Sequence, residues 1–337
     1  MYFQMSKKAN PREIALTLLH RVIRSTQENI PLPALIACEE NYWHLNNLEK
    51  SYLNEITYGV LRSFSWLDRI LNGFVSHPKH LSPLQIILLK IACYEILFIK
   101  NIPFHATVNE AVRIARKRFG KRQAGLVNAV LRKVTASSSE ILAVTQQHES
   151  DMYSHPEGLS QASSIPLWLA VMWCEHYGND IAGRLASYLL SPPPFCWRIN
   201  AARAESHLIR KKCIAEGCEP FGAYGLSLSF PASKKAHSMQ NFLQWEKSGL
   251  ISRQGRPSQL VAEFISLTLS QSVQGKVSLW DCCCGRGGKT TALAEQGVTV
   301  ALASDPSSFR IDALRQQFVR IGLKVPPVRC ATAQEIY

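Results

Sequence analysis

The sequence predicts a multidomain protein in which an all-α helical bundle precedes a small α+β module and an α/β domain. Three observations support this order. Residues 10–135 show helical periodicity without strand-like alternation, residues 192–250 mix both patterns, and strand, glycine turn and helix alternate from residue 258 onward. The length of 337 residues and a hydrophobic fraction of 46% suffice for two or three ordinary cores.

The all-α domain is predicted over residues 6–136. Residues Asn10–Glu13 (NPRE) suggest a helix start, with an N-cap, a proline in the first turn and an acid placed for a capping box. Residues Ser82–Gln85 (SPLQ) repeat this pattern. The helix that they open, up to Ile99, is apolar on nearly all sides and is therefore expected at the centre of the bundle. Gly120 is expected to end one helix before the next begins.

The charge of the chain favours a polyanionic partner, nucleic acid first. The formal net charge is +13, from 38 Lys and Arg against 25 Asp and Glu. Six basic residues gather where two predicted helices meet, and a clamp on RNA phosphates is their predicted role. The alternative is a solvated face with favourable charge at a helix C-terminus. The predicted RNA contacts are Arg113, Arg116, Lys117, Arg118, Lys121 and Arg122.

The cysteines and the most apolar segment indicate a cytoplasmic protein. Ten cysteines occur without paired spacing and without an export signal, which is typical of free thiols in a reducing cytoplasm. The apolar segment 83–99 is too short for a membrane span and contains Lys90 and Glu95, so a buried core helix is expected there.

Residues 137–191 are expected to form a linker with helices, one of which ends at Gly178. Residues 192–250 are predicted to form the small α+β module. FCWRIN and GLSLSF alternate like strands, whereas AESHLIRKKCIAEG is helical with a glycine stop.

A glycine-rich turn dominates residues 251–337. SLWD is a short strand, GRGG turns the chain, KTTALAEQG begins a helix, and VTVALASD forms a second strand that ends in Asp305. This order is typical of a nucleotide-binding half-domain. Glycines let backbone N–H groups approach a ligand, a helix N-terminus favours negative charge, and an acid after the second strand can accept ribose hydroxyls.

Three ligands fit the turn less well than S-adenosylmethionine. A phosphate loop would need glycine at Cys283, and a dinucleotide turn would need one at Thr290. Zinc would need a second ligand pair, and Cys213 and Cys218 are too loosely spaced to supply it, so no metal is predicted. S-adenosylmethionine remains, with its carboxylate at the turn and its ribose at Asp305.

Several segments resemble one family of enzymes. DCCCGRGGKTTALAE resembles the D-x-C-A-A-P-G-G-K-T motif of RNA 5-methylcytosine methyltransferases. YGVLR, LVNAVLRK, IPLWLAVMWCEHYG and PPPFCWRIN resemble further segments, in the order found in the Sun/RsmB (Fmu) family of 16S ribosomal RNA cytosine-5 methyltransferases. The resemblance extends over nearly the whole chain. It implies a NusB-like RNA-binding bundle, a small α+β module, a Rossmann-like methyltransferase domain, S-adenosylmethionine as cofactor and ribosomal RNA as partner.

The resemblance also implies which residues hold the cofactor, with Asp305 on the ribose. The alternative for Lys289 is helix capping and solvation, and the alternative for the cysteines is that they are small apolar side chains at the end of the sheet. The implied turn residues are Cys283, Cys284, Gly285, Arg286, Gly287, Gly288 and Lys289.

The sequence departs from the family pattern at three places. Arg286 places charge near the expected path of the cofactor's sulfonium, Gly255 replaces an acid before the domain, and Ala331 or Thr332 stands where an acid is expected near the adenine.

The family mechanism implies a cysteine thiolate that attacks cytosine and a second cysteine that assists product release. Both are expected beyond Tyr337, and Cys330 follows neither pattern. Residues 251–337 are thus expected to be the N-terminal part of the methyltransferase domain, no catalytic residue is assigned, and this chain alone is expected to be inactive. The alternative is a non-catalytic RNA-binding module with a vestigial methyltransferase domain; an antitermination-like factor is a weaker third interpretation.

Overall fold

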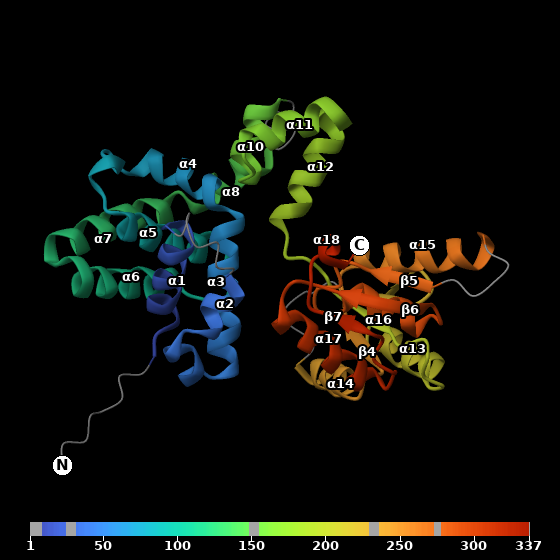
Figure 1. The fold of residues 1–337 in the computed structure, drawn as a ribbon. Coiled ribbons are helices and arrows are strands. Elements are labelled where there is room, and N and C mark those ends of the chain that lie inside the picture. Colours follow the sequence, from blue (N-terminus) through green and yellow to red (C-terminus); the bar gives the residue numbers. More distant parts are fainter. Residues whose placement is uncertain (1–8, 25–31, 148–154, 229–235, 273–277, 337) are drawn as a thin grey trace, which may run out of the picture. The chain divides into compact units, whose positions relative to one another are not determined.

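The computed structural model describes residues 9–24, 32–147, 155–228, 236–272 and 278–336 (Figure 1). The predicted domain start at residue 6 and the final residue, 337, lie outside the described residues. The chain divides between Pro192 and Pro193 into two compact units, each with its own core.

The first unit consists of helices throughout its described residues (Figure 1). Its α-helices are α1 (Pro11–Arg24), α2 (Leu32–Ala37), α3 (Asn47–Arg62), α4 (Phe64–Phe74), α5 (Pro83–Phe98), α6 (Phe104–Phe119), α7 (Lys121–Ala136), α8 (Ser138–Gln147), α10 (Pro156–Ser163), α11 (Leu167–Tyr177) and α12 (Asn179–Leu190). Two 3-10 helices, η1 (Glu40–His44) and η2 (Pro78–His80), join them. No described helix has the length and apolar character that a membrane crossing requires.

Helix α5 lies at the centre of the bundle, as its composition predicts. Twelve of its residues are buried, and it contacts α1, α3, α4, α6 and α7. Its predicted capping box is confirmed: the Ser82 hydroxyl accepts from the Gln85 N–H at 3.3 Å, and the Gln85 side chain accepts from the Ser82 N–H at 2.7 Å. Gly120 ends α6 with φ of 88°, a conformation that glycine adopts without strain.

The capping box predicted at the start of α1 is wrong. The Asn10 side chain accepts from the Arg12 N–H at 2.9 Å, but the Glu13 carboxylate does not return to Asn10. It accepts from Lys117 Nζ at 2.7 Å instead. Three cations at the end of α6 lie within 4.0 Å of this carboxylate, and their combined attraction exceeds that of one backbone amide.

Glu95 joins four helices of the bundle. Its side chain is fully buried and accepts from Arg12 Nε at 2.8 Å and Arg12 NH2 at 2.8 Å. The Tyr52 hydroxyl donates to it at 2.6 Å and the Thr107 hydroxyl at 2.9 Å. These donors come from α1, α3 and α6, so one carboxylate on α5 ties three surrounding helices to the centre.

Lys90 is the second charged residue buried in α5. Its side chain is 1% exposed, its ammonium lies 2.7 Å from an Asp68 carboxylate oxygen, and it sits 3.0 Å from the ring centre of Phe64. Burial lowers the pKa of Lys90 to about 8, and the partner Asp68 opposes that shift. The ammonium therefore loses its proton in the folded protein well before it does so in the unfolded chain.

Lys90 is expected to make stability rise with pH above about 8. Between that pKa and the ordinary lysine value of about 10.4, the unfolded chain binds a proton that the folded protein has lost, so the free energy of unfolding increases with pH. Between pH 8 and 9.5, we expect the free energy of unfolding of the wild type to rise by about 1–2 kcal/mol more than that of Lys90→Met. Denaturant unfolding of both proteins across this range measures it. Parallel stability curves would contradict the assignment.

The segment 137–191, predicted as a linker with helices, contributes α8 and α10–α12 to the first unit. Helix α10 packs against α4. The hydroxyl of Ser164, directly after α10, accepts from the Ser65 N–H at 3.0 Å. These contacts explain why the described part of this segment groups with the bundle.

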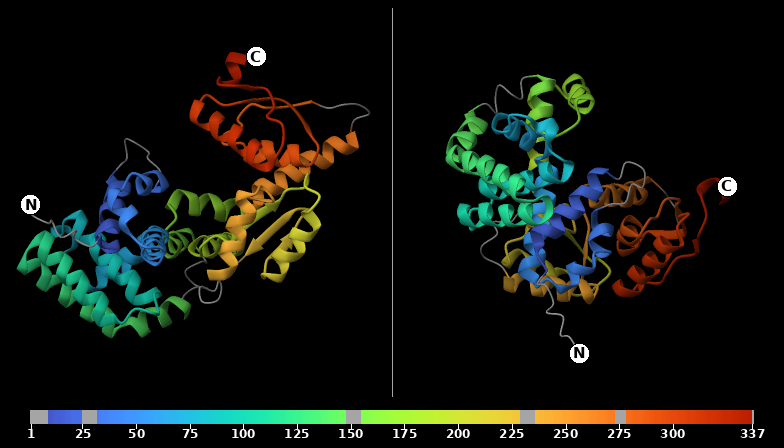
Figure 2. Two further views of the ribbon diagram at one scale, coloured as in Figure 1. Left: turned by 90° about the horizontal axis from the view of Figure 1, so that it is seen from below. Right: turned by 90° about the vertical axis from the view of Figure 1, so that its left-hand side faces the viewer.

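The second unit contains two sheets with helices between them (Figure 2). Its elements are β1 (Phe195–Ile199), α13 (Ser206–Ala215), β2 (Glu219–Phe221), β3 (Gly225–Leu228), α14 (Ala236–Lys247), β4 (Ile251–Arg253), α15 (Arg256–Ser272), β5 (Ser278–Asp281), α16 (Gly288–Glu295), β6 (Thr299–Ser304), α17 (Ser308–Ile321), β7 (Val328–Arg329) and α18 (Ala333–Ile336). Helix α15 contacts β3 of one sheet and α16, which contacts β6 of the other.

The two sheets have different topologies. The first is antiparallel in the order β2-β3-β1-β4, with Trp197 opposite Leu226 on one side and Arg253 on the other. Trp197 is fully buried and stacks on Phe242 with ring centres 4.5 Å apart. The second sheet is parallel in the order β5-β6-β7, the 3-2-1 order of a nucleotide-binding half. The glycine turn therefore lies where such folds bind ligands, at the carboxyl end of the first parallel strand.

Candidate functional site

The glycine turn between β5 and α16 adopts a conformation that requires glycine. Gly285 and Gly287 have φ of 53° and 85°, in the left-handed region. The Cys284 N–H donates to the Ser304 carbonyl at 3.0 Å, and the Gly287 N–H donates to the Cys284 carbonyl at 2.9 Å. A Cβ at Gly287 would lie 3.0 Å from Leu314, so the turn also approaches α17 closely.

Two carboxylates at the ends of neighbouring strands hold the turn. Asp281, the last residue of β5, accepts from the Thr290 hydroxyl at 2.7 Å and from the Cys283 N–H at 3.3 Å. Asp305, directly after β6, accepts from the Gly285 N–H at 3.1 Å and from the Ser307 N–H at 3.0 Å. The turn is thus fixed from both sides before any ligand binds.

Asp305 has a role that the sequence reasoning missed. Its side chain is 4% exposed, and Arg310 contacts the same carboxylate at 3.5 Å. An ionised carboxylate has about four acceptor sites, and the contacts to Gly285, Ser307 and Arg310 use three of them. Asp305 therefore orients the turn first, and its contact with a ribose stays a prediction.

The exposed part of the turn consists of Cys282, Cys283, Arg286, Gly288 and Lys289. The first amides of α16, at Gly288 and Lys289, have no carbonyl acceptor within their helix, and such amides attract anions. The Arg286 guanidinium lies 5.9 Å from the ring centre of Phe309, which places it against α17. These residues form the surface that a ligand of the turn would meet.

The three adjacent cysteines have different environments. Cys284 is buried in a cluster with Ala303, Ile311 and Leu314, and burial together with two nearby aspartates raises its pKa to about 12. Cys282 and Cys283 are exposed, and the neighbouring Cys282 raises the pKa of Cys283. Cys284 is thus a small apolar core residue. Within the described ranges, no three His, Cys, Asp or Glu side chains are placed to hold a metal ion.

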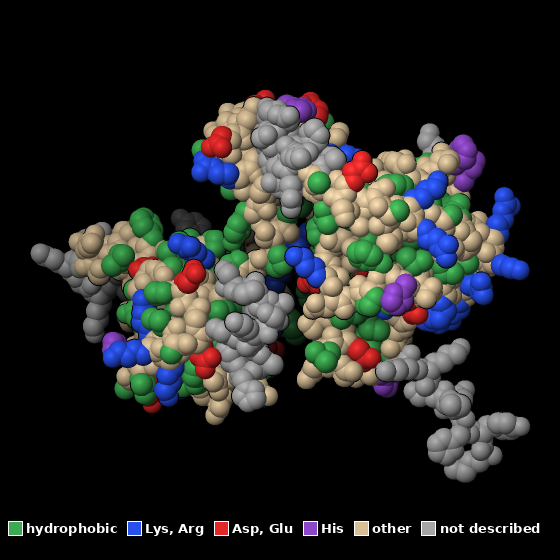
Figure 3. Space-filling model, turned by 180° about the vertical axis from the view of Figure 1, so that it is seen from behind, with side chains coloured by type: hydrophobic (Ala, Val, Ile, Leu, Met, Phe, Trp, Pro, Cys, Tyr) green, Lys and Arg blue, Asp and Glu red, His purple; other side chains and the backbone are tan. Residues whose placement is uncertain are grey.

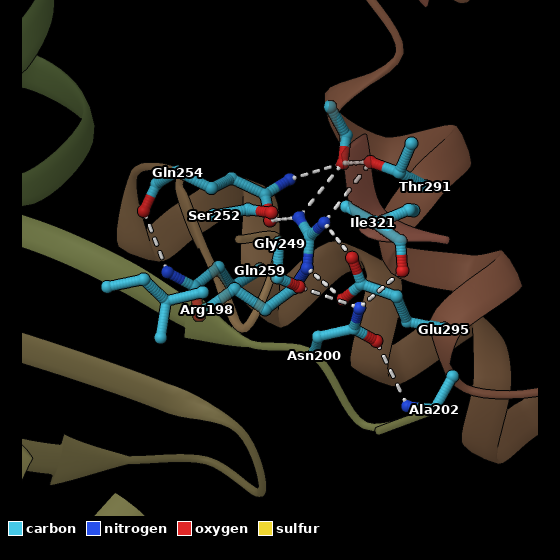
Figure 4. A network of polar contacts seen from close by, with 12 residues as sticks. Arg198, Asn200, Ala202, Gly249, Ser252, Gln254, Gln259, Thr291, Glu295 and Ile321 are labelled. Carbon is cyan, nitrogen blue, oxygen red and sulfur yellow. Dashed lines mark hydrogen bonds and ion pairs between the residues drawn. The ribbon is translucent and has the colours of Figure 1, made fainter. Parts of the chain in front are cut away.

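A buried network braces the helix that follows the turn (Figure 4). Arg198 of β1 binds Glu295 of α16 through two hydrogen bonds of 2.7 and 2.8 Å, and the two side chains are 3% and 1% exposed. The same guanidinium donates to the Gly288 carbonyl and to the Thr291 hydroxyl, both at 3.1 Å, and also to Gln254. Arg198 thereby holds both ends of α16.

Asn200 and two glutamines extend this network. The Asn200 amide donates to the carbonyls of Gly249 at 2.9 Å and Ile321 at 3.1 Å, which ties β1 to the end of α17. Gln254 donates to the Gly288 carbonyl at 3.0 Å, and Gln259 donates to the Gln254 carbonyl at 2.7 Å. The sequence by itself assigned no role to any of these side chains. Their contacts in the fold show that they position the glycine turn.

The structure separates the six predicted RNA contacts into two groups, although all six are exposed. The first group is paired with acids. Glu13 lies 3.4 Å from Arg113, 2.7 Å from Lys117 and 4.0 Å from Arg118, and Glu110 lies 2.8 Å from Arg113. These three cations line a cavity of about 600 Å³ whose wall also contains acids, so much of their charge is already neutralised.

The second group consists of Arg116, Lys121 and Arg122, at the corner where α6 ends and α7 begins. Among the residues that the structure describes, none of these three has an acidic partner. Figure 3 shows Lys and Arg side chains gathered at this end of the helical unit. The unpaired group is therefore the better candidate for phosphate contacts.

Comparisons with known proteins find matches in both units. Residues 9–136 match the NusB family. Over 325 residues the chain is 27% identical to the probable ribosomal RNA small subunit methyltransferase B of Bacillus subtilis (strain 168), which covers 95% of this chain and 68% of that protein. It is 25% identical to ribosomal RNA small subunit methyltransferase B of Pseudomonas putida, over 95% of this chain and 69% of that protein. The chain thus spans about two thirds of the length of these relatives.

A solved structure shows the same fold. The crystal structure of PH0851 matches 97% of this chain and 70% of its own chain, with a TM-score of 0.61 and 18% identity. The matches to the curated relatives add similarity in sequence, at 25–27% identity, through both units. The chain therefore carries a NusB domain over residues 9–136 and is homologous, across most of its length, to ribosomal RNA small subunit methyltransferase B proteins.

Proposed function

We propose that the chain binds S-adenosylmethionine at the glycine turn and ribosomal RNA at the α6–α7 corner, as part of an RNA cytosine-5 methyltransferase acting on 16S ribosomal RNA. The observation that carries the proposal is the turn itself. Two left-handed glycines, two strand-end aspartates and the first amides of α16 meet at one edge of a parallel sheet. The names of the relatives, ribosomal RNA small subunit methyltransferase B, support the same activity.

Different residues of the turn would contact different parts of the cofactor. The amides of Gly288 and Lys289 would hold the methionine carboxylate, and the remaining acceptor site of Asp305 would meet a ribose hydroxyl. When bound, S-adenosylmethionine supplies an electrophilic methyl group. The charge of Arg286 opposes that sulfonium, but its guanidinium lies over the ring of Phe309 on α17.

The proposal assigns no cysteine as nucleophile. A nucleophilic cysteine needs a lowered pKa. Burial instead raises the pKa of Cys93, Cys213 and Cys284 to about 12, and Cys283 is also shifted upward. These four cysteines are therefore poor candidates for a nucleophile, and the proposed roles of the described residues are to hold the cofactor and the RNA.

Asp305→Asn tests the cofactor site. The asparagine keeps the shape of the side chain but loses the charge and one acceptor oxygen, so we expect the affinity for S-adenosylmethionine to fall at least about ten-fold. Calorimetric titration of the full chain measures it, with ATP and NAD as ligands that should not bind.

Asp312→Asn is the matched control for this titration. Asp312 lies on α17, is 64% exposed and pairs only with Arg315, so its replacement should leave the affinity unchanged. If the wild-type chain does not bind S-adenosylmethionine, or binds ATP or NAD equally well, the cofactor assignment fails.

The two groups of cations are expected to contribute unequally to RNA binding. Neutralising Arg116, Lys121 and Arg122 to glutamine should reduce the slope of log affinity against log salt by about 2, because each phosphate contact contributes roughly 0.7–0.9. The same change at Arg113, Lys117 and Arg118 should have a smaller effect, since Glu13 and Glu110 already neutralise them. Fluorescence anisotropy with ribosomal RNA fragments measures both slopes. Equal slopes for the two triple variants would contradict this division.

A non-catalytic RNA-binding module is the second candidate function. The near-complete burial of the Asp305 carboxylate, which already accepts from the Gly285 and Ser307 N–H groups, favours it. The two candidates differ in one observable. The module would bind RNA but not S-adenosylmethionine, whereas the methyltransferase would bind both.

A further inference from the structure

A second cavity, of about 590 Å³, opens in the helical unit between the end of α4, the turn η2 and one face of α7. Its size falls in the range of cavities that hold small ligands. The residues of its wall that matter here are His77, His80, Arg122, Leu126, Ala129 and Lys133.

The wall of this cavity combines positive charge with aromatic faces. Arg122 stands near the start of α7, and Lys133 stands three turns further along the same helix. The rings of His77 and His80 lie stacked, with centres 5.4 Å apart and planes 24° apart. Both histidines are exposed, so their faces are accessible.

The cavity differs from the first one in its charge. The first is lined by Glu13 and Glu39 together with three cations, and Glu13 pairs with all three. No acidic residue lines the second, and neither Arg122 nor Lys133 has an ion pair among the described residues. Its positive charge is therefore available to an anion from outside.

The floor of the cavity is apolar. Phe74 and Val75 come from the end of α4, and Leu126 and Ala129 come from α7. Leu126 is 37% exposed and so presents apolar surface to the solvent. A ligand with a flat apolar ring and an attached anionic group would match this apolar surface and the cations beside it.

We propose that this cavity binds one unstacked nucleotide of single-stranded RNA, with the base on the histidine rings and the apolar floor and the flanking phosphates at Arg122 and Lys133. The inference rests on the proposed RNA binding and adds a defined base site to it. Proteins that bind single-stranded RNA stack unpaired bases on aromatic side chains and hold the backbone with cations. The stacked imidazoles favour a nucleotide over an acidic peptide, because charge alone would not require an aromatic face.

The test compares two RNA probes that differ only in their bases. A short single-stranded oligoadenylate and an abasic oligomer of the same length are titrated against the full chain by fluorescence anisotropy. The wild-type chain should bind the oligoadenylate about ten-fold more tightly, which is the contribution expected of one stacked base. His77→Ala combined with His80→Ala should reduce this preference to less than about two-fold and leave abasic binding unchanged.

Further variants separate the base site from the charge around it. Ala129→Leu narrows the cavity with a side chain that has no aromatic ring, and it keeps every cation, so it should lower the base preference without changing the salt dependence. Arg122→Gln with Lys133→Gln should weaken binding of both probes and lower the salt slope by about 1–2. Arg184→Gln with Arg315→Gln, which removes two exposed cations outside the cavity wall and outside the α6–α7 corner, is the matched control and should change neither the base preference nor the salt slope. Circular dichroism confirms that each variant is folded.

The outcomes distinguish this inference from the proposed function. If the wild-type chain binds RNA but the histidine and Ala129 variants keep the full base preference, the nucleotide site is wrong and RNA binding stands. If the oligoadenylate and the abasic oligomer bind the wild type equally, the base site is also wrong. If neither oligomer nor ribosomal RNA binds, the proposed RNA binding fails and the site fails with it.

Discussion

Replacing Glu95 with leucine is expected to lower the free energy of unfolding of the helical unit by about 3–5 kcal/mol. The variant leaves Arg12, which is 17% exposed, without its bidentate partner. It also removes the acceptor for the hydroxyls of Tyr52 and Thr107. A buried group that loses its partner carries its full desolvation cost, which exceeds what the hydrogen bond contributed. Denaturant-dependent hydrogen exchange, read on peptides of α1, α3, α5 and α6, measures the change separately from the second unit.

Two further variants test whether the unpaired charge causes this loss of stability. Arg12→Met in the Glu95→Leu background should recover most of it, because removing both charges leaves neither unpaired. Glu110→Gln is the control. That carboxylate is partly exposed and pairs with Arg113 at the surface, so its loss should cost less than about 1 kcal/mol. A cost below 1 kcal/mol for Glu95→Leu would show that this carboxylate does not hold the bundle together.

Replacing Arg198 with methionine should destabilise the second unit by about 3–5 kcal/mol and weaken S-adenosylmethionine binding with it. The variant leaves Glu295, which is 1% exposed, as an unpaired buried charge. It also releases the Gly288 carbonyl and the Thr291 hydroxyl, so the start of α16 loses the contacts that hold it beside β1. Hydrogen exchange of α16 peptides and calorimetric titration of the cofactor measure the two effects.

Arg253→Met is the matched control for Arg198→Met. Arg253 lies on the neighbouring strand β4, is 51% exposed and pairs with Glu246, so its loss should cost less than about 1 kcal/mol and leave cofactor binding unchanged. Arg198→Lys keeps the charge but loses the bidentate hydrogen bonding. Its stability and its cofactor affinity should lie between those of the wild type and Arg198→Met. RNA affinity should be the same in all of these variants. Cofactor affinity that survives in Arg198→Met would show that the network stabilises the unit without positioning the turn.

The elements that sequence reasoning placed well are those with local signals. Helix α5 was expected at the centre because its residues are apolar on nearly all sides, and twelve of them are buried. The capping box of Ser82 and Gln85 needs only four consecutive residues. The glycine turn was expected between a strand and a helix from the spacing of its glycines, and Gly285 and Gly287 adopt the left-handed conformations that make glycine necessary.

The expectation that failed at Glu13 and the role that was missed at Asp305 share a physical cause, which is contact with residues outside the local sequence pattern. Glu13 was expected to cap its own helix, but Lys117 lies 104 residues away and takes its carboxylate. The contact of Asp305 with a ribose stays a prediction, but its hydrogen bond from the Gly285 N–H, 20 residues back, was not expected. A pattern of neighbouring residues does not show which distant side chain or backbone group will pair with a carboxylate in the folded protein.

The sequence by itself determined the helical bundle, the strand–turn–helix order and the basic corner, because periodicity, glycine spacing and charge act over a few residues. Only the tertiary structure decided which charges are already paired and which remain available to a ligand. Arg198 and Glu295 stand 97 residues apart and meet only after two sheets and α16 have packed together. The difference between a self-neutralised cavity at Glu13 and an unneutralised one at Arg122 likewise depends on which helices lie side by side.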